Sequence, residues 1–222
     1  MAFTVATIIC AILAFFLGGI PFGLIVGRAF GKQDLRKEGS GNTGTTNAMR
    51  TMGMGPGVLV FLLDALKGAL AIFIMHIGVS TAASFSGEFT LLTSTAAHRV
   101  ATLALLSVVL GHIFSPYLGF KGGKGIATAV GGLLAFIPVT ALALIVLFAV
   151  LVIVTRTVSI GSIAAAACLV PVAFFFDVKD GVALLMLLGV TVFVIWAHRG
   201  NIRKLMRGEE KQFAIEKKSN GS

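Results

Sequence analysis

The sequence predicts an all-α integral membrane protein, a helix bundle of seven transmembrane segments. Its composition is 57% hydrophobic and only 12% charged, which is typical of a chain that crosses a membrane several times. Several uncharged apolar runs are long enough to cross a hydrocarbon core of about 30 Å as helices. The formal net charge of +9 is carried by Lys and Arg in a few polar segments, as in cytoplasmic loops of membrane proteins. The basic excess therefore requires no nucleic-acid partner.

The apolar runs define one polytopic domain over residues 1–210, followed by a polar tail at 211–222. No basic residue precedes the first run and no small-residue cleavage site follows it, so we expect a retained span. The segment at 126–137 is short for a full span and would need to be covered by protein. The expected segments are about 3–26, 53–79, 96–113, 126–137, 138–154, 159–176 and 182–197.

The apolar stretch at 126–154 decides the topology. One long tilted helix would put the basic tail on the opposite side from the loop at 28–50. Two segments broken near Pro138 instead put that loop, residues 114–125, Arg156 and residues 198–218 on one face. Because the second arrangement gathers most Lys and Arg on one face, as cytoplasmic loops require, we predict an outside N-terminus and a cytoplasmic C-terminus.

A polar stretch at 39–50, GSGNTGTTNAMR, separates the first two apolar runs. Its glycines let backbone N–H groups approach a ligand and form a concave nest for an anion, and Arg50 can hold phosphate through two parallel hydrogen bonds. The alternative is a plain linker between two helices. A dinucleotide-binding reading of its G-x-G-x-x-G pattern fails because no β-strand precedes it. The candidate ligand contacts are Ser40, Gly41, Asn42, Thr46, Asn47 and Arg50.

A second basic, glycine-rich segment, Lys121-Gly122-Gly123-Lys124-Gly125, opens an apolar helix. Backbone N–H groups at a helix start, with two ammonium groups, suit phosphate. It is not a Walker A loop, since Gly125 stands where that motif needs Ser or Thr. The alternative is a basic turn that binds lipid headgroups.

Two charges lie inside the second span. Asp64 and Lys67 are three residues apart and so share a helix face. Because a charge at mid-membrane costs roughly 2.5–3.5 kcal/mol, the pair must face protein or a wet cavity. Lys67 contributes to a ligand cavity, or the two residues form a self-neutralising pair that orients helices.

Two histidines end predicted spans on the same face. His112 ends the third span and His198 the seventh, and Asn201 would lie on the same side as His198 of a continuing helix. His76 and His98 lie toward the opposite face, where we interpret them as structural. The sequence offers no metal-ligand cluster.

Four motifs, in order along the chain, resemble those of the bacterial membrane acyl-phosphate:glycerol-3-phosphate acyltransferases of the PlsY family. They are SGNTGTTNAMR at 40–50, GHIFSP at 111–116, FKGGKGIAT at 120–128 and HRGN at 198–201. The resemblance runs from about Gly19 to Glu210. The chain departs from the family pattern at Thr45, where Ala is usual, and at Gly200, where Glu is common.

The resemblance implies an enzyme that moves a fatty acyl group from acyl phosphate to the 1-hydroxyl of glycerol 3-phosphate. The products are lysophosphatidic acid and phosphate, early in phospholipid synthesis. It further implies no metal or cofactor, a bacterial plasma membrane location, an active site at the cytoplasmic face, and the enzyme that makes acyl phosphate as a possible partner.

Roles follow for the matching residues. The phosphates and the acyl carbonyl oxygen are assigned to Ser40, Asn42, Asn47, Arg50 and residues 121–124. His198 and Asn201 are assigned to the glycerol hydroxyls, and His112 is a general base or a structural ligand to the first loop. A substrate phosphate oxygen is the alternative base. The catalytic candidates are therefore Ser40, His112, His198 and Asn201. The remaining substrate contacts are Gly41, Thr46, Lys67, Thr128, Ser159 and Ser162.

The rival class is a membrane transporter of phosphate or a phosphorylated solute, since short spans and helix-start anion sites also suit transport. The polar clusters gather on one predicted face rather than at mid-membrane, which favours the enzyme.

Overall fold

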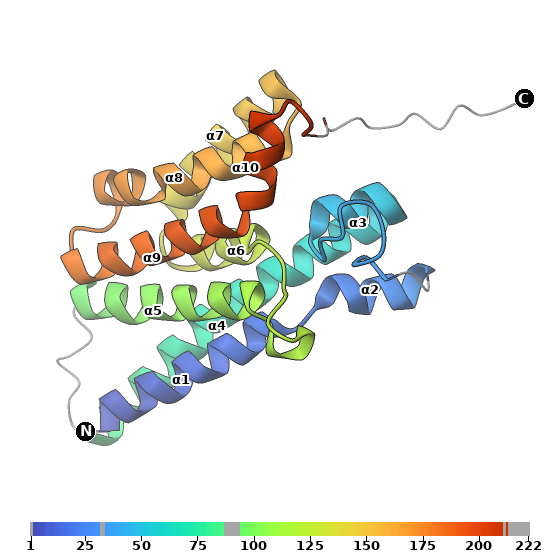
Figure 1. The fold of residues 1–222 in the computed structure, drawn as a ribbon. Helices are drawn as coiled ribbons and strands as arrows, with labels where there is room; N and C mark the ends of the chain where they lie inside the picture. Colours follow the sequence, from blue (N-terminus) through green and yellow to red (C-terminus); the bar gives the residue numbers. More distant parts are fainter. Residues whose placement is uncertain (1, 32–33, 87–93, 211, 213–222) are drawn as a thin grey trace, which may run out of the picture.

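The computed structural model describes residues 2–31, 34–86, 94–210 and 212, and the regular elements in this part of the chain are all helical (Figure 1). The all-α prediction is therefore confirmed. Beyond position 212, the predicted polar tail lies outside the described residues. The helices are α1 (Ala2–Gly19), α2 (Phe22–Gly31), α3 (Thr45–Met52), α4 (Met54–Ser86), α5 (Ser94–Ile113), α6 (Ile126–Phe136), α7 (Pro138–Thr155), α8 (Val158–Phe176), α9 (Gly181–Ala197) and α10 (Arg199–Met206), with the 3₁₀ turn η2 (Pro116–Leu118).

The number of spans differs from the prediction. Five described segments are long and apolar enough to cross a membrane: Phe3–Phe30, Met54–Phe85, Thr95–Leu118, Pro138–Thr155 and Val158–Phe176. Helices α9 and α10 make a sixth if they are taken together, although the chain bends by 55° between them. With 11 residues, α6 is too short. Several spans are thus present, and the count of seven is not confirmed.

The short helix α6 is preceded by extended chain that enters the bundle. Backbone N–H groups of Gly122 and Gly123 donate to the carbonyls of Ile113 and His112 at the end of α5. Gly125 then caps α6 with φ +82°, a left-handed conformation that disfavours a side chain, and packs on Val109. Residues 122–125 are therefore held against the end of α5, and α6 begins directly after them.

The far end of α6 reaches the opposite end of the bundle. Pro138 starts α7 directly after it, and the Thr140 hydroxyl donates to Asp177 at the turn between α8 and α9. Arg99 of α5 pairs with Asp180 at the same turn, with 2.8 Å between Nη2 and Oδ2. This turn lies at the end away from α3 and α10 (Figure 1).

Small residues let α4 and α6 pack closely. A Cβ on Gly68 would lie 2.0 Å from the carbonyl oxygen of Thr128, and one on Gly131 would lie 1.8 Å from that of Ala65. Side chains at these positions would drive the helices apart, as is common where membrane helices meet. Helix α4 is therefore held against α6, which fixes its buried charges below the start of α6.

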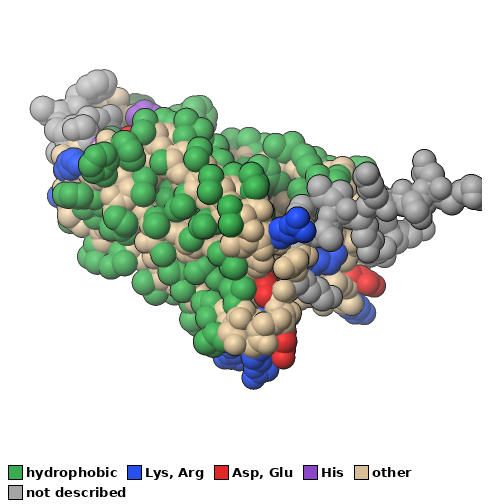
Figure 2. Space-filling model, turned by 90° about the horizontal axis from the view of Figure 1, so that it is seen from above, with side chains coloured by type: hydrophobic (Ala, Val, Ile, Leu, Met, Phe, Trp, Pro, Cys, Tyr) green, Lys and Arg blue, Asp and Glu red, His purple; other side chains and the backbone are tan. Residues whose placement is uncertain are grey.

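The outer surface is apolar. On the face shown in Figure 2, apolar side chains cover the bundle, and the charged side chains lie at its margins. An apolar surface of this extent is unfavourable in water and is suited to contact with the acyl chains of a bilayer. Its exposed members include Ile8, Ile12, Leu62, Phe73, Val146 and Leu185.

Candidate active site

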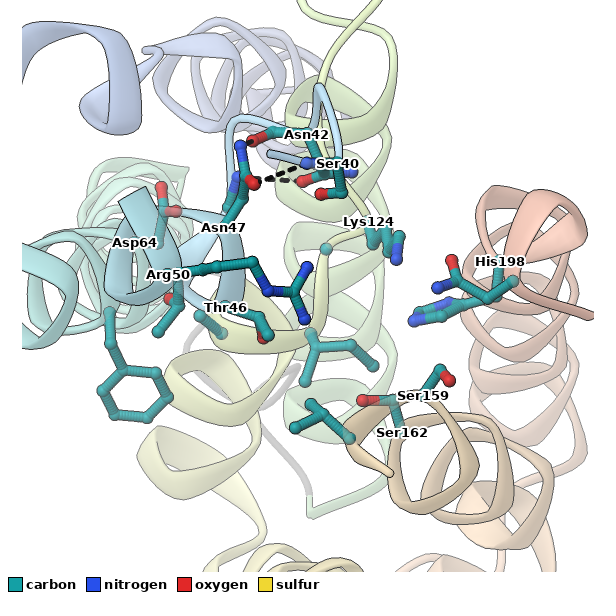
Figure 3. A pocket seen from close by; sticks show the side chains of 18 of the residues that line it. Ser40, Asn42, Thr46, Asn47, Arg50, Asp64, Lys124, Ser159, Ser162 and His198 are labelled. Atoms are coloured by element: carbon teal, nitrogen blue, oxygen red, sulfur yellow. Dashed lines mark hydrogen bonds between the residues drawn. The ribbon is translucent and has the colours of Figure 1, made fainter. Parts of the chain in front are cut away.

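A polar cavity of about 210 Å³ lies at the end of the bundle that carries α3 and α10 (Figure 3). Its walls come from segments far apart in the sequence: the loop at 39–44, α3, the start of α6, the start of α8, and the α9–α10 junction. Its polar lining residues include Ser40, Asn42, Thr45, Thr46, Asn47, Arg50, Asp64, His112, Lys124, Ser159, Ser162, His198, Asn201, Lys204 and Glu210.

The first wall is shaped by Asn47. Its side-chain amide nitrogen donates to the carbonyls of Leu35, Glu38 and Asn42, at 2.8–3.0 Å, and its Oδ1 accepts from the Ser40 N–H at 2.8 Å. Figure 3 shows Asn47 linked in this way to Ser40 and Asn42. Because these bonds engage its polar atoms, Asn47 holds the loop in shape, and its contact with substrate stays a prediction.

The start of α3 offers an anion site. Gly44 caps the helix without a side-chain hydrogen bond, so the first N–H groups of α3 are not capped by a side chain. The buried Thr45 Oγ1 beside them has no hydrogen-bond partner among the described residues. Arg50 extends from the other end of α3 into the cavity, toward Lys124 and His198 (Figure 3). Donors and positive charge thus converge on one space.

Lys124 supplies a second positive charge. Burial is the main cause that lowers the pKa of its ammonium, to about 8, and the nearby Lys204 and Arg50 charges act in the same direction. The Glu210 carboxylate opposes them by favouring the charged form. Lys124 is therefore an ammonium in a cavity crowded with positive charge, and an incoming anion would relieve that repulsion.

His198 presents a lone pair to the cavity. Its Nδ1 lies 2.8 Å from the carbonyl oxygen of Val194. Because a carbonyl can only accept, Nδ1 must carry the proton, which leaves Nε2 as an acceptor in the neutral ring. The buried ring is held against α9 by this bond. His198 can therefore accept a proton from a hydroxyl group placed in the cavity.

Glu210, just after α10, closes the wall between α8 and α10. Its Oε1 accepts from the Ser159 hydroxyl at 2.8 Å and from the Asn201 amide at 2.6 Å. Gly208, with φ +68°, turns the chain back toward the cavity, and the Glu209 N–H closes this turn on the Lys204 carbonyl. The carboxylate thus joins two predicted site residues.

A buried network lies below the cavity. Lys67 Nζ lies 2.7 Å from Asp64 Oδ1 and donates to the Ile20 carbonyl, at the break between α1 and α2. The helix is broken at this point, because the Leu24 N–H, which would bond the Ile20 carbonyl in a continuous helix, donates to the Pro21 carbonyl instead. Lys67 does not line the polar cavity, and its ligand contact stays a prediction. The alternative, a self-neutralising pair that orients helices, describes it.

His112 contacts this network. Its Nδ1 lies 3.3 Å from Thr128 Oγ1 and 3.7 Å from Asp64 Oδ1. Its Nε2 faces Gly123, where a Cβ would lie only 2.2 Å away. The ring therefore supports residues 122–125 of its own loop, rather than the first loop. Thr128, fully buried beside it, supports the ring and does not line the cavity.

A basic groove of about 400 Å³ adjoins the cavity. It shares Ser40, Asn42, Lys124, Asn201 and Lys204 with the cavity, and adds Lys121, Gly122, Gly123, Arg199 and Arg203. The second predicted motif is thus divided: Lys124 faces the cavity as well as the groove, whereas Lys121 and its two glycines face the groove.

An apolar channel of about 200 Å³ adjoins the cavity between α6, α7, α8 and α9. Phe61, Ile126, Phe148 and Ser162 line both spaces, so that the polar cavity continues into the channel. The rest of the channel is lined mainly by aliphatic side chains, including Ala129, Leu133, Leu144, Ala165, Leu169 and Val190. It can bury an alkyl chain whose polar end remains in the cavity.

The structure brings most of the predicted site residues together. Those that line the cavity are Ser40, Asn42, Thr46, Asn47, Arg50, His112, Lys124, Ser159, Ser162, His198 and Asn201. Gly41 lies behind the first wall with φ +71°. Sequence reasoning missed Thr45, Phe61, Phe148, Lys204 and Glu210. Glu210 and Lys204 lay in a segment interpreted as a basic tail, and the Gly208 turn was the available signal. Among the described residues, His, Cys, Asp and Glu do not form a group of three or more that could hold a metal.

The fold and the site define a class: a polytopic membrane protein with an anion-binding cavity that continues into an alkyl-sized channel. Comparison with known proteins narrows the class. The family model for glycerol-3-phosphate acyltransferase matches residues 8–208. A glycerol-3-phosphate acyltransferase of Clostridioides difficile (strain 630) is 39% identical over 210 residues, which are 95% of this chain and 97% of that protein. One of Synechococcus elongatus is 39% identical over 202 residues, covering 90% and 91%.

Two solved structures are also similar. The crystal structure of PlsY, an integral membrane glycerol 3-phosphate acyltransferase, in its glycerol 3-phosphate form has a TM-score of 0.79 and 36% identity, covering 94% of this chain and 96% of that one. The lysophosphatidic acid form has a TM-score of 0.77 and 34% identity, covering 94% and 95%. The chain belongs to the glycerol-3-phosphate acyltransferase (PlsY) family of integral membrane proteins, which confirms the resemblance found in the motifs.

Proposed function

We propose that the protein transfers a fatty acyl group from acyl phosphate to the 1-hydroxyl of glycerol 3-phosphate, releasing lysophosphatidic acid and inorganic phosphate. The observation that carries this proposal is the continuity of the polar cavity with the apolar channel through Phe61, Ile126 and Phe148. A molecule with an alkyl chain and a phosphate at its end fits this pair of spaces. Acyl phosphate is such a molecule, and its reactive carbonyl would lie at the junction.

The two substrates each carry a phosphate, and the site offers two anion-binding regions. One is the start of α3 with Thr45 and Arg50, and the other is the basic groove with Lys121 and Lys124. Positive charge placed beforehand stabilises the charge that develops on the departing phosphate. Ser40 and the Asn42 amide nitrogen, which line both spaces, are well placed to donate to the acyl carbonyl oxygen or to a phosphate.

The transfer needs one proton to leave the attacking hydroxyl. His198 Nε2 accepts it as the hydroxyl oxygen forms a bond to the acyl carbon, and the carbon–oxygen bond to phosphate then breaks. The released phosphate can take the proton, which restores the neutral imidazole. A phosphate oxygen of the substrate is the alternative base, because acyl phosphate is already an activated anhydride. Asn201 helps to position the glycerol hydroxyls.

The charge distribution supports a cytoplasmic site in the bacterial plasma membrane. The cavity end carries Arg50, Lys121, Lys124, Arg156 and the basic residues of α10, whereas Arg99 and Lys179 lie toward the other end. Together with the passage of residues 121–137 through the bundle, this favours seven segments, an outside N-terminus and a cytoplasmic C-terminus. An acyl-phosphate-forming enzyme would be a natural neighbour there, because its product is this enzyme's donor.

The test uses purified protein in detergent with radiolabelled glycerol 3-phosphate. Palmitoyl phosphate should give labelled lysophosphatidic acid without any added cofactor, whereas palmitoyl-coenzyme A should not. Product from the coenzyme A thioester alone would contradict the proposed donor. No acyl ester with either donor, together with uptake of labelled solute into liposomes that contain the protein, would favour a transporter instead.

A further inference from the structure

Glu210 presents an anomaly in a cavity built for anions. Its carboxylate lines the space into which Arg50, Lys124 and Lys204 bring positive charge. A negative charge there repels substrate phosphate, so its presence requires a different partner. The carboxylate is only half-occupied: Oε1 accepts from Ser159 and Asn201, and no described residue provides a partner for Oε2.

The cavity needs acceptors, because glycerol 3-phosphate brings hydroxyl donors. Three of the other side-chain acceptors of the lining are already engaged. The Asn42 Oδ1 accepts from the Gly44 N–H, the Asn47 Oδ1 from the Ser40 N–H, and Asp64 pairs with Lys67. His198 Nε2, Asn201 Oδ1 and the second oxygen of Glu210 have no such partner among the described residues, and of these three only the Glu210 oxygen belongs to a carboxylate. Glu210 lies within electrostatic range of both His198 and Lys124.

His198 and Glu210 both line the cavity, so each can take one of two neighbouring hydroxyls. If His198 Nε2 takes the 1-hydroxyl, as in the proposed function, the neighbouring acceptor faces the hydroxyl on the next carbon. The phosphate at the third carbon then points away from the carboxylate and toward Arg50 and Lys124. This orientation sets the phosphate against positive charge, whereas the reverse orientation sets it against the carboxylate.

We propose that Glu210 is a specificity-determining residue that accepts a hydrogen bond from the 2-hydroxyl of the acyl acceptor. This inference rests on the proposed function. It implies that the enzyme selects a vicinal diol phosphate and rejects acceptors without a donor at the second carbon. Dihydroxyacetone phosphate has a carbonyl oxygen there, whose lone pairs would oppose the carboxylate. 3-Hydroxypropyl phosphate has only hydrogen there and leaves the carboxylate without its partner.

The test measures kcat/KM for glycerol 3-phosphate and for these two analogues, with one acyl phosphate donor. An acceptor of the cavity wall that is left without its donor lowers the rate of transfer, so we expect the wild-type protein to prefer glycerol 3-phosphate over 3-hydroxypropyl phosphate by about 100-fold or more. A wild-type preference below about threefold would overturn the inference without any variant. No transfer to glycerol 3-phosphate at all would instead contradict the proposed function.

The variant Glu210→Gln distinguishes a role in acceptor specificity from a purely structural role. The amide oxygen of Gln can still accept from Ser159 and Asn201, so the wall between α8 and α10 should hold. We expect kcat/KM for glycerol 3-phosphate to fall about 10-fold or more and that for 3-hydroxypropyl phosphate to change less than about twofold. Dihydroxyacetone phosphate should improve, because the Gln amide can donate to its carbonyl. An equal loss for all three acceptors would show a merely structural role and overturn the inference.

Two further variants complete the design. Glu209→Gln removes the adjacent carboxylate, which is exposed and does not line the cavity, and should leave all three values unchanged. Glu210→Asp keeps the charge but withdraws it by one methylene, so it should narrow the preference even if Glu210→Gln does not fold. A preference that is unchanged in Glu210→Asp would again count against the inference.

Discussion

At the scale of single residues, His198 and His112 differ in a way that kinetics can separate. His198 faces the cavity with an available nitrogen, so His198→Ala should lower kcat by about 100-fold or more with little change in KM. His112 supports Gly123 from below, so His112→Ala should mainly raise KM by loosening the phosphate-binding loop. Steady-state assays with both substrates varied would measure the two effects.

The matched control for these variants is His76→Ala. His76 is exposed on α4 and lies outside the cavity lining, so its loss should leave both parameters unchanged. A near-normal kcat in His198→Ala would remove the histidine as base and favour a substrate phosphate oxygen.

The lowered pKa of Lys124 gives a pH dependence. Below about 8 the ammonium is charged and can bind phosphate, and above this value the charge is lost. We therefore expect KM for glycerol 3-phosphate to rise as the pH increases from about 7 to 9.5. Lys124→Arg stays charged throughout, because the guanidinium group of Arg keeps its proton over this whole pH range. In this variant the rise in KM should disappear, as measured by initial rates in a series of buffers.

The expected rise in KM with pH cannot be explained by a loss of protein stability caused by the titration of Lys124. Its pKa is lower in the folded protein than the ordinary value of about 10.4, so between about 8 and 10.4 the unfolded chain binds more protons. The contribution of this group to stability therefore increases with pH over the range in which binding is lost. An alkaline rise in KM that persists in Lys124→Arg would point to another titrating group.

The sequence could predict which residues belong to the site, but it could not predict the role of each one. Arg50, Lys124 and His198 are polar residues in a mostly apolar chain, which by itself indicates a function. The motifs around them predicted that this function is the binding of phosphate and hydroxyl groups. Asn47 looks identical to a ligand-binding amide in the sequence. Only the loop geometry shows that its donors and acceptor are occupied by backbone. The bond from Lys67 to the Ile20 carbonyl could not be predicted either, because it depends on where α1 breaks.

At the scale of helices, the apolar channel is the proposed acyl site, and its length should limit the acyl chains that the enzyme accepts. Ala165 of α8 lines it together with residues of α6, α7 and α9. Ala165→Phe should fill part of the channel and lower kcat/KM for palmitoyl phosphate by about 10-fold or more, while a short-chain donor such as octanoyl phosphate loses much less. The measurement is the ratio of kcat/KM for the two donors.

The neighbouring Ala164 provides the comparison. It lies on the same helix but does not line the channel, so Ala164→Phe should leave the ratio of the two donors unchanged. If Ala165→Phe lowered both donors equally, the channel would not be the acyl site.

Helix boundaries were largely predictable, because apolar runs and their Gly, Pro and charged ends are local features. The segment starting at Ile126 shows the limit. The sequence indicated a short helix, and it begins at the predicted residue, but its shortness is explained by residues 121–125 entering the bundle as extended chain. That path depends on hydrogen bonds to the carbonyls of His112 and Ile113, which a local pattern does not reveal. The channel-lining Phe61 and Phe148 could not be distinguished from lipid-facing aromatic residues for the same reason.

At the scale of the whole molecule, the orientation in the membrane can be tested by labelling. In a protein with Cys10 and Cys168 replaced by Ala, Met206→Cys in α10 and Lys179→Cys in the α8–α9 turn mark the two ends of the bundle; both positions are exposed. In intact cells, an impermeant maleimide should label the second and not the first. Permeabilised cells should show both, which controls for reactivity.

The opposite labelling pattern, or labelling of both sites in intact cells, would contradict the predicted topology. The sequence could predict this orientation only from the distribution of Lys and Arg between the two faces. No local pattern shows whether residues 126–154 cross the membrane once or twice.

The joined cavity and channel also determine which measure of donor concentration controls the rate of the enzyme. The channel lies among α6, α7, α8 and α9, and α7 and α8 turn exposed apolar side chains such as Val146 and Phe174 outward. A long-chain donor gains about 0.8 kcal/mol for each methylene that leaves water, so it gathers in the same lipid phase as these helices. The rate should then follow the mole fraction of donor in the bilayer or micelle. Adding detergent at a fixed amount of donor would slow the enzyme by dilution within the surface, while glycerol 3-phosphate would continue to obey its concentration in water.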